Sequence, residues 1–590
     1  MEPLLQPQMR QSDGMSADGP SSLRSLQYVT DRSVAGVSVE NLSIRIGDRL
    51  LLNHTSAEFP ADRLTLILGY SGAGKSMLLK ILAGLIPSEH EFIRATGTVR
   101  FGTVVSGSDP ANAGESPEAA VSSRDGSDSG TAPSGTAAVA LGEAESAAHG
   151  SAVSIVFQDF ALFDELTPAE NIRIALDHGQ QRLQPAESER ITADLLQQLG
   201  VPDDRPVSVL SGGQQQRLAI ARAVAPGTRV ILYDEPTSGL DAATAVQAAR
   251  LIRETHDRYR RTSIVVTHDY ERLCPIADRI LLLDHQQGVL RELSPEDMLD
   301  PRAALGDAPE AWAAVQPQRS FATRLCAPLI ATGLLAEELI RVPWNILPRW
   351  KSARWGLRWL RFYLRLVAGG SAVVYVATAC MLLGYVAQDF VFRYLPYRQF
   401  SEPLLLENLL HATGFSLYRF LVPILATLLL AARSGAAVTA NLGSKVYGGQ
   451  LDALRSVGAD PRRLLRTAVL ISFIVGIPVL SVIGYFVAAW SAGYAFLLDH
   501  GELGVAFWTA HFHQQLFVDG RFLYRGTGWL LPKLICCGAG TGVIAWLKGT
   551  APKQSAAEIS DAVTSAILWS TLYVLLVHFL FSLFEFVPQR

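Results

Sequence analysis

The chain has 590 residues, a net charge of −4 at pH 7 and five cysteines. A chain of this length exceeds what one hydrophobic core usually organises, so at least two domains are expected. The charge gives no reason to expect nucleic-acid binding. The cysteines lack the spacing of a disulfide framework or a metal site, so we interpret them as packing thiols.

Two segments are predicted to lack stable structure. Residues 1–34 carry acidic side chains and no apolar core of a secretory signal, which indicates a flexible tail. Residues 104–150 contain no aromatic residue. Such a composition buries too little apolar surface to offset chain entropy, so we expect a disordered surface insertion. It interrupts residues 35–300, which otherwise alternate polar and apolar stretches like a soluble domain.

The most specific motif is GYSGAGKS, residues 69–76, which follows the strand-like LTLIL and precedes MLLKILAGL with its helical period. A strand, a glycine-rich loop and a helix in this order form a phosphate cradle, and a chance glycine loop is a poor alternative in this context. The lysine reaches the β- and γ-phosphates, and the next serine binds Mg²⁺. The predicted nucleotide-binding residues here are Gly69, Ser71, Gly72, Ala73, Gly74, Lys75, Ser76 and Met77.

A second motif, VILYDEP at residues 230–236, is an apolar strand that ends in two carboxylates. Asp234 is predicted to hold Mg²⁺, and Glu235 is predicted to polarise the attacking water. An apolar strand ending in Asp-Glu is weak evidence alone. It becomes specific here because LSGGQ, residues 210–214, stands shortly before it in a chain that already carries the phosphate cradle.

Together these motifs resemble the nucleotide-binding domain of ABC transporters, an α/β P-loop fold that uses ATP and Mg²⁺. The resemblance identifies Gln158 as the Q-loop glutamine and a Mg²⁺ ligand, SGLD at residues 238–241 as the D-loop, and His268 as the switch histidine. Taken alone, His268 would be better explained as a hydrogen-bonded core residue. The catalytic residues that the resemblance implies are Glu235, His268 and Gln158.

The signature LSGGQ completes the ATP site against the P-loop of another domain in this family. The chain has one P-loop and one signature, so we predict a homodimer with two identical composite ATP sites. Ile46 stands where the family often stacks an aromatic side chain on adenine, which leaves open how adenine is held. The further ATP-binding residues are Ser211, Gly212, Gly213, Gln214 and Asp241.

Beyond about residue 345 come apolar runs that are long enough to cross a bilayer. Before them, residues 346–367 interleave Trp, Leu and Phe with Arg and Lys at helical spacing, which favours an interfacial amphipathic helix over an ordinary basic linker. The predicted fold is therefore multidomain, with the ATPase, a linker over residues 301–345, and an all-α polytopic membrane permease over residues 346–590. The five predicted crossings are residues 367–388, 415–440, 466–496, 528–547 and 563–586.

The segment between the second and third crossings sets the predicted orientation. It carries the basic residues Lys445, Arg455, Arg462, Arg463 and Arg466, which the positive-inside rule places in the cytoplasm beside the ATPase. Five crossings then leave the C-terminus outside. We interpret the segment as a coupling element that contacts the ATPase; the alternative is an exposed basic loop that only sets topology.

A stripe of small residues precedes this segment. Its members repeat every four positions and are predicted to pack against another helix in lipid. They are Ala432, Ala436, Ala440 and Ser444.

AARSGAAVTANLGS followed by GQLDALRSVGADPRRLL resembles the MlaE-type permease, and FALFDELT and LYDEPTSGLD resemble its partner ATPase, MlaF. The resemblance implies phospholipid transport at the inner membrane with an MCE-domain, MlaD-like partner outside the cytoplasm, and it admits a small STAS-type cytoplasmic subunit. Fusion in one chain departs from the usual separate subunits. Asn441 also stands where the family commonly has a glutamate, and Gly449 replaces a polar or acidic residue.

Two other functions share parts of this pattern. An ABC exporter of small amphiphiles would use the same ATPase with another cargo. A membrane-anchored ATPase could instead regulate a partner without transport, although a mere anchor needs fewer helices than five.

Overall fold

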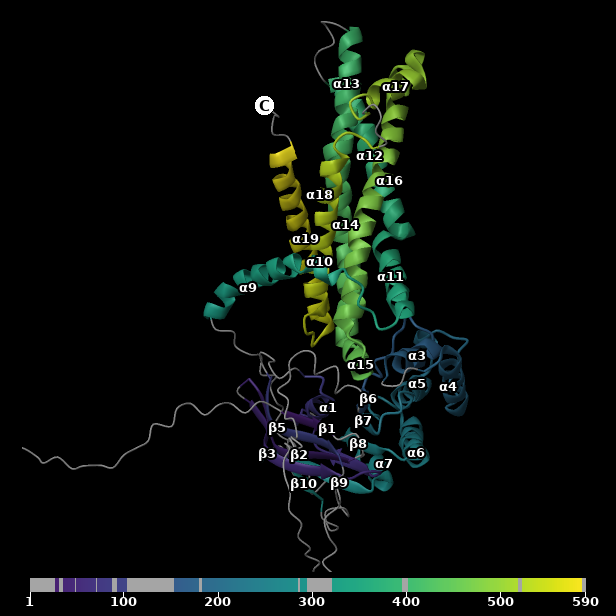
Figure 1. Ribbon diagram of the computed structural model, residues 1–590, viewed down its shortest axis with the longest axis vertical. Helices are drawn as coiled ribbons and strands as arrows, with labels where there is room; N and C mark the ends of the chain where they lie inside the picture. Colours follow the sequence, from purple (N-terminus) through teal and green to yellow (C-terminus); the bar gives the residue numbers. More distant parts are fainter. Residues whose placement is uncertain are drawn as a thin grey trace, which may run out of the picture.

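The computed structural model describes residues 27–30, 36–47, 49–70, 72–86, 93–102, 153–179, 183–284, 287–293, 321–394, 402–517 and 523–585. The predicted insertion of residues 104–150 lies outside this set. An α/β domain lies at one end of a bundle of long helices (Figure 1). The predicted fold class, an α/β ATPase joined to an all-helical membrane domain, is therefore confirmed.

Two sheets build the described part of the ATPase. The four-stranded sheet has the order β1-β5-β2-β3, and the six-stranded sheet has the order β10-β9-β4-β8-β7-β6. The first contains β1 (Gln27–Thr30), β2 (Gly36–Ile46), β3 (Arg49–Phe59) and β5 (Ile93–Gly102). The second contains β4 (Leu64–Leu68), β6 (Val153–Val156), β7 (Val230–Asp234), β8 (Thr262–Thr267), β9 (Arg279–Asp284) and β10 (Val289–Glu292).

Strand β1 departs from the prediction of a flexible tail. Residues 27–30 pair in parallel with β5 and extend the edge of the first sheet. In the second sheet, β4, β7 and β8 are buried along their whole length, and they pair in parallel. Strands covered on both faces need continuous apolar runs, which is why LTLIL and VILYD show no alternation.

The ATPase helices begin at capping residues that the sequence supplies. Thr167 and Glu170 form a capping box at the start of α3, and Asp241 caps α6. The helices are α1 (Lys75–Leu82), α3 (Pro168–His178), α4 (Pro185–Gln198), α5 (Gly212–Val224), α6 (Ala242–Tyr259) and α7 (Tyr270–Leu273), with 3₁₀ turns at Val207–Val209 and Cys274–Ile276.

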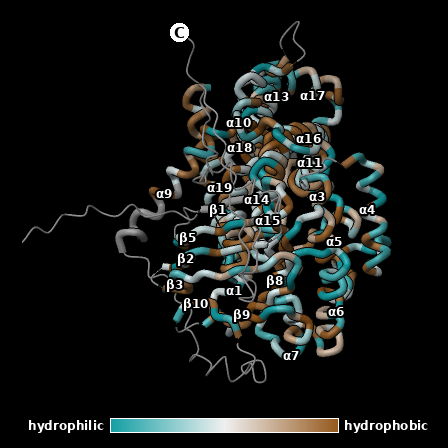
Figure 2. Tube along the Cα trace, turned by 60° about the horizontal axis from the view of Figure 1, so that its bottom comes forward, coloured by the Kyte–Doolittle hydropathy of each residue, from teal (hydrophilic) through white to brown (hydrophobic). Residues whose placement is uncertain are grey.

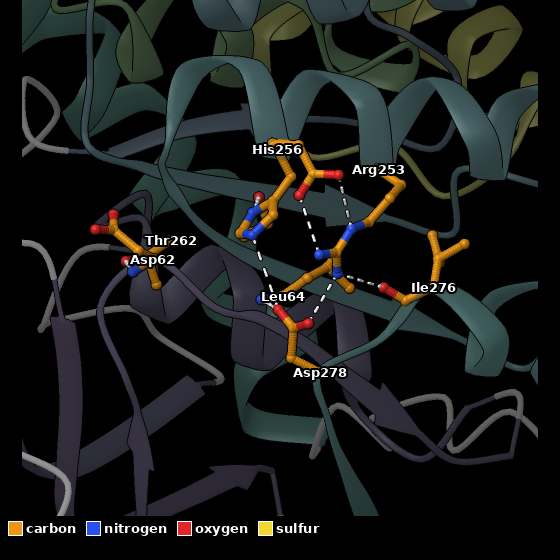
Figure 3. Close-up of polar contacts among 9 residues, drawn as sticks. Asp62, Leu64, Arg253, His256, Thr262, Ile276 and Asp278 are labelled. Carbon is orange, nitrogen blue, oxygen red and sulfur yellow. Dashed lines mark hydrogen bonds and ion pairs between the residues drawn. The ribbon is translucent and has the colours of Figure 1, made fainter.

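Polar contacts fix α6 to the second sheet (Figure 3). Arg253 donates to the Asp278 carboxylate at 2.8 Å and to the Ile276 carbonyl at 3.1 Å. The Leu64 N–H donates to the same carboxylate at 2.8 Å, and His256 Nε2 lies 3.8 Å from it. Leu64 begins β4, whose other end leads into the P-loop, so this cluster stabilises the sheet away from the nucleotide site.

The permease is a bundle of long helices. The described residues contain five helices that are long and apolar enough to cross a membrane, which agrees with the five predicted crossings. They are 353–392, 406–447, 462–499, 527–550 and 556–585. The elements are α9 (Phe321–Ile340), α10 (Val342–Asn345), α11 (Ala353–Ala368), α12 (Gly370–Tyr394), α13 (Glu402–Ser416), α14 (Val422–Tyr447), α15 (Gln450–Ser456), α16 (Thr467–Asp499), α17 (Gly504–Phe512), α18 (Thr527–Thr550) and α19 (Ala556–Glu585), with π-turns at Leu417–Leu421 and Arg462–Arg466 and a 3₁₀ turn at Gly501–Leu503.

Hydropathy divides the molecule in the same way. Figure 2 shows hydrophobic segments concentrated in the bundle and hydrophilic segments along α4. On α19, large apolar side chains are exposed at helical spacing, which is how a helix presents itself to lipid or to another helix in a membrane. They include Leu568, Leu572, Leu576, Phe579 and Leu583.

Helix α11 is amphipathic as predicted, but it does not lie across the bundle. It runs nearly in line with α12 and packs on α14 and α16 (Figure 1). Its aromatic face, with Trp355, Trp359 and Tyr363, is buried there, so protein rather than lipid covers it. The helix that runs crosswise to the bundle is α9, which extends sideways from its lower part (Figure 1). Together with α10 it falls inside the predicted linker.

The predicted packing stripe on α14 is not the buried face within this chain. Ala432, Ala436 and Ala440 are only partly buried, and Ser444 is exposed. The buried face is one position away and includes Gly435, whose added Cβ would meet Ser570 and Thr541 at 3.6 Å. Small residues stand on both faces of this helix, and their spacing alone does not tell the two apart.

Candidate ATP site and its contact with the permease

The P-loop takes a shape that requires glycine. Gly74 caps α1 with a φ of 97°, and an added Cβ would lie 3.0 Å from Leu51. Lys75 Nζ donates to the carbonyls of Gly69 at 2.8 Å and Tyr70 at 3.0 Å. These acceptors hold the ammonium group inside the loop, where the phosphates of a nucleotide would meet it.

The residues predicted to hold Mg²⁺ lie together at the end of β7. Ser76 Oγ donates to Asp234 Oδ1 at 2.8 Å, and Asp234 is 5% exposed. Burial, and then the neighbouring Glu235 carboxylate, raise the pKa of Asp234. A hydroxyl and a buried carboxylate beside a second carboxylate are oxygen ligands that favour a small divalent cation, so Ser76 and Asp234 fit Mg²⁺.

Glu235 contacts the P-loop lysine and the predicted switch histidine. Its carboxylate forms an ion pair with Lys75 Nζ at 3.1 Å and contacts His268 Nδ1. The His268 side chain is 56% exposed, which is inconsistent with a buried core histidine. Glu235 also has a φ of 47°, a backbone strain that its N–H bond to the Val266 carbonyl at 2.9 Å maintains.

The Q-loop glutamine lies beside the D-loop. Gln158 Nε2 donates to Ser238 Oγ at 3.3 Å, and the Ser238 N–H donates to the Glu235 carbonyl at 3.0 Å. This chain of contacts connects the Q-loop to the Walker B glutamate. Coordination of Mg²⁺ by Gln158 stays a prediction.

The signature begins α5 as a capping box. Ser211 and Gln214 exchange hydrogen bonds of 3.3 and 3.0 Å between side chain and backbone. Added Cβ atoms at Gly212 and Gly213 would meet Leu240 and Thr244, so the signature lies against the D-loop side of the same chain. Helix α5 packs on α3, α6 and β6, whereas α1 packs on β7 and β8.

The remaining predicted residues are placed as follows. Asp241 accepts a hydrogen bond from the Thr244 N–H at 3.2 Å, and Met77 packs against the ATPase core. Ser71 lies outside the described residues. Near Ile46, Arg49 Nη2 donates to the Gly72 carbonyl at 3.0 Å, so a cation from the β2–β3 hairpin reaches the P-loop.

Arg222 makes a structural contact beside the site that the motifs did not indicate. It is fully buried on α5 and donates to the carbonyls of Phe160 and Ala161, the latter at 2.5 Å. Both acceptors have positive φ, and burial lowers the pKa of Arg222 to about 10. The sequence feature that could have pointed to Arg222 is a lone arginine inside the apolar run LAIARAVA. This side chain connects the signature helix to the loop that follows Gln158.

The segment between the second and third candidate spans contacts the ATPase, as predicted. Gln450 Nε2 of α15 donates to the Leu162 carbonyl at 2.7 Å, and Lys80 of α1 pairs with Asp452 at 3.3 Å. Gly449 begins α15 with a φ of 68°. This conformation favours glycine, which accounts for the departure from a polar or acidic residue at that position.

Comparisons with known proteins divide the chain at the same boundary. Residues 52–238 match the family model of ABC transporters, and residues 365–584 match that of the permease MlaE. The chain is also similar to the sulfate/thiosulfate import ATP-binding proteins CysA 1 of Chromobacterium violaceum, with 35% identity over 42% of this chain and 59% of that protein, and CysA of Burkholderia mallei, with 35% identity over 46% of this chain and 66% of that protein. The chain thus spans about 59% to 66% of the length of these relatives.

Solved structures also resemble the ATPase half. The ATP-binding cassette MJ0796, in a dimeric post-hydrolysis state bound to ADP and Pi, is 25% identical. It aligns with 43% of this chain and 97% of its own, with a TM-score of 0.33.

Proposed function

We propose that this chain, which joins an ABC ATPase domain to an MlaE permease domain, uses ATP hydrolysis to move phospholipid between the inner membrane and an MCE-type partner. The observation that carries the proposal is the MlaE match over residues 365–584, because the permease rather than the ATPase contacts cargo. Sulfate/thiosulfate import is the function in the names of the ATPase relatives. Those relatives are similar to the ATPase half of the chain, and ATPase domains of this kind serve transporters with different cargoes.

The charges of the bundle support an apolar cargo. Arg419 and Lys533 both pair with Glu585, whose side chain is buried, at 2.5 and 3.1 Å. Charges that are paired inside the bundle are not available to a hydrophilic solute. An acyl chain needs no such partner, since each buried CH₂ contributes about 0.8 kcal/mol.

The test of cargo uses the purified protein and reconstituted vesicles. Mass spectrometry of the purified dimer is expected to find bound phospholipid. In vesicles that also hold an MCE-type partner, labelled phosphatidylethanolamine is expected to move only with ATP and only with Glu235 intact. Absence of bound lipid, together with ATPase stimulation by sulfate or by a small amphiphile, would replace phospholipid with that solute.

ABC transporters act as dimers, and we propose that two copies of this chain form two identical composite sites. The P-loop and the signature of one chain would each complete a site with the partner copy. ATP and Mg²⁺ would supply the scissile phosphate and its charge neutralisation. Lys75 would leave its loop carbonyls for the phosphates, and Glu235 would orient the attacking water.

Mixed dimers test the composite site. Lys75→Ala and Gly213→Asp each damage both sites of a homodimer. A mixed dimer of the two variants concentrates both defects in one site and leaves the other intact. Co-purified mixed dimers are therefore expected to recover about half of wild-type ATPase activity if the two sites act independently. No recovery in mixed dimers, or full activity in a strictly monomeric particle, would contradict the homodimer.

We further propose that the ATPase and α15 lie in the cytoplasm and that the C-terminus lies outside. The five candidate spans and the basic segment around α15 support this orientation. A periplasm-dependent reporter enzyme fused after Arg590 is expected to be active, and the same reporter fused within α15 is expected to be inactive. The reverse pattern would invert the topology.

A further inference from the structure

Helix α11 makes polar contacts of its own with the ATPase. Trp355 Nε1 donates to Asp177 on α3 at 2.7 Å. Arg358 Nη2 donates to Glu170 on α3 at 2.8 Å and to the Glu165 carbonyl at 3.1 Å. Trp355 is buried in one apolar cluster with ATPase side chains that include Phe163, Leu166 and Ile174. The first half of α11 is therefore docked on the ATPase.

A buried ion pair lies at the centre of this contact. Lys445, near the end of α14, is 3% exposed and pairs with the Glu165 carboxylate, which also accepts from Asn441 Nδ2 at 3.1 Å. The ammonium lies 5.2 Å from the ring centre of Trp359 on α11 and 6.0 Å from that of Phe163. This cation thus joins three parts of the chain: the loop after the Q-loop glutamine, α11 and α14.

The other end of α11 is held by α14. The helical path is interrupted at Gly369, between α11 and α12. The carbonyls of the last turn of α11 therefore need donors from outside the helix. Arg433 donates to the Leu366 carbonyl at 3.2 Å and to Ser371 Oγ at 2.6 Å. Ser434 Oγ donates to the Val367 carbonyl at 2.8 Å. Both sides of the break are therefore fastened to one helix.

We propose that α11 is a second transmission element between the ATPase and the permease, and that Lys445 is a positioning residue that transmits movement of the Q-loop segment through Glu165. Movement of this segment on ATP binding shifts α3 and Glu165 together. The shift passes through Trp355, Arg358 and Lys445 to the α11–α12 break. The two elements meet at Lys445, since its ammonium also donates to Gln450 Oε1 of α15 at 3.3 Å. Their other polar contacts with the ATPase differ, because α15 contacts Leu162 and Lys80.

The coupling path rests on the proposed function only in the choice of phospholipid as cargo. The double variant Glu165→Gln/Lys445→Met removes both buried charges and keeps apolar bulk beneath the rings, so that neither partner is left as an unpaired charge. The single variant Lys445→Arg keeps the charge. Arg463→Met is the matched control. It removes a cation from the same side of the permease, and the ion pair of that cation with Asp460, at 3.1 Å, is largely exposed.

Two measurements on the full-length dimer test the idea. Hydrogen exchange over residues 366–372 is expected to change on ATP addition in a Glu235→Gln background, and this change should shrink about fivefold in the double variant. In vesicles, phosphatidylethanolamine moved per ATP hydrolysed should fall about fivefold, with ATP affinity kept within about twofold. Lys445→Arg and Arg463→Met should behave like wild type in both measurements.

Failure of the cargo assignment and failure of the coupling path differ in these data. If wild type moves no lipid while exchange at residues 366–372 still depends on ATP and on the Glu165–Lys445 pair, the path stands and phospholipid does not. If exchange responds to ATP equally in wild type and in the double variant, α11 does not transmit the signal. If Arg463→Met lowers lipid movement per ATP and the exchange response as much as the double variant does, the specific role of Lys445 is overturned.

Discussion

The ATP site and the α11 contact are built in opposite ways. In the ATP site, Lys75, Ser76, Asp234 and Glu235 stand within short motifs at the ends of strands, and backbone carbonyls and N–H groups position them. In the α11 contact, single side chains meet from distant parts of the chain, as when Lys445 reaches Glu165 across 280 positions. Each ATP-site motif shapes its own loop, and the pairing of β4 and β7 with β8 in one sheet brings the two motifs together. The coupling contact exists only after both domains are folded.

The largest effect is expected at the catalytic glutamate. Glu235→Gln keeps the shape of the side chain and removes its negative charge and basicity, so ATP should bind while hydrolysis falls by about 10²–10⁴-fold. Phosphate release and retention of bound ATP by the purified dimer measure both steps. A near-normal hydrolysis rate would remove Glu235 from the role of catalytic base.

Loss of the P-loop lysine should weaken binding rather than the chemical step alone. Lys75→Ala removes the ammonium that meets the phosphates, and a charge-assisted hydrogen bond contributes about 1.5–3 kcal/mol. The Kd for ATP should therefore rise about tenfold or more. Titration with a fluorescent ATP analogue measures it, and Leu82→Met, which keeps apolar packing at the far end of α1, is the control. An unchanged Kd would contradict the phosphate contact.

The motifs and the spans were predictable because each is local. The P-loop follows the buried strand β4, and Asp234 and Glu235 stand at the end of the buried strand β7. An apolar run of bilayer length indicates a span without any knowledge of its neighbours. The faces of helices were not predictable in this way. The amphipathic pattern of α11 identifies an apolar face but does not tell whether lipid or α16 covers it, and the small residues of α14 stand on two faces. Arg222 and Glu165 gain their roles only from partners far along the chain.

A smaller effect is expected where α11 meets α3. Asp177→Ala removes the carboxylate that accepts from the Trp355 indole N–H at 2.7 Å and leaves the buried indole in place. Asp177 is exposed, so water can take the place of the carboxylate as acceptor, and the loss should be about 1 kcal/mol. The melting temperature of the dimer should fall by about 2 °C, measured by thermal unfolding in detergent. A fall no larger than that of Asp194→Ala, an exposed aspartate on α4, would show that the hydrogen bond does not stabilise the contact.

The smallest effect is a pH dependence of stability that arises from His178, at the C-terminal end of α3. His178 is buried on α3 and contacts the Ile174 carbonyl at 2.9 Å. Burial, with Lys351 nearby, lowers its pKa below 6.5 in the folded state, against the opposing influence of Ile174 and Asp177. A lowered pKa means that the unfolded chain takes up the proton first as pH falls. The stability that neutral His178 contributes is therefore present above pH 6.5 and is lost as pH falls through the lower, folded-state pKa.

This loss can be separated from that of the other histidines by comparison with His178→Gln, which does not titrate. Between pH 7 and pH 5.5 the melting temperature of wild type should fall by about 1 °C more than that of the variant, because every other titrating group is common to both. Equal slopes for the two proteins would mean that His178 accepts a proton in the folded state as readily as in the unfolded chain. The buried end of α3 would then be open to water, and the contact between α3 and the permease would be looser than its hydrogen bonds indicate.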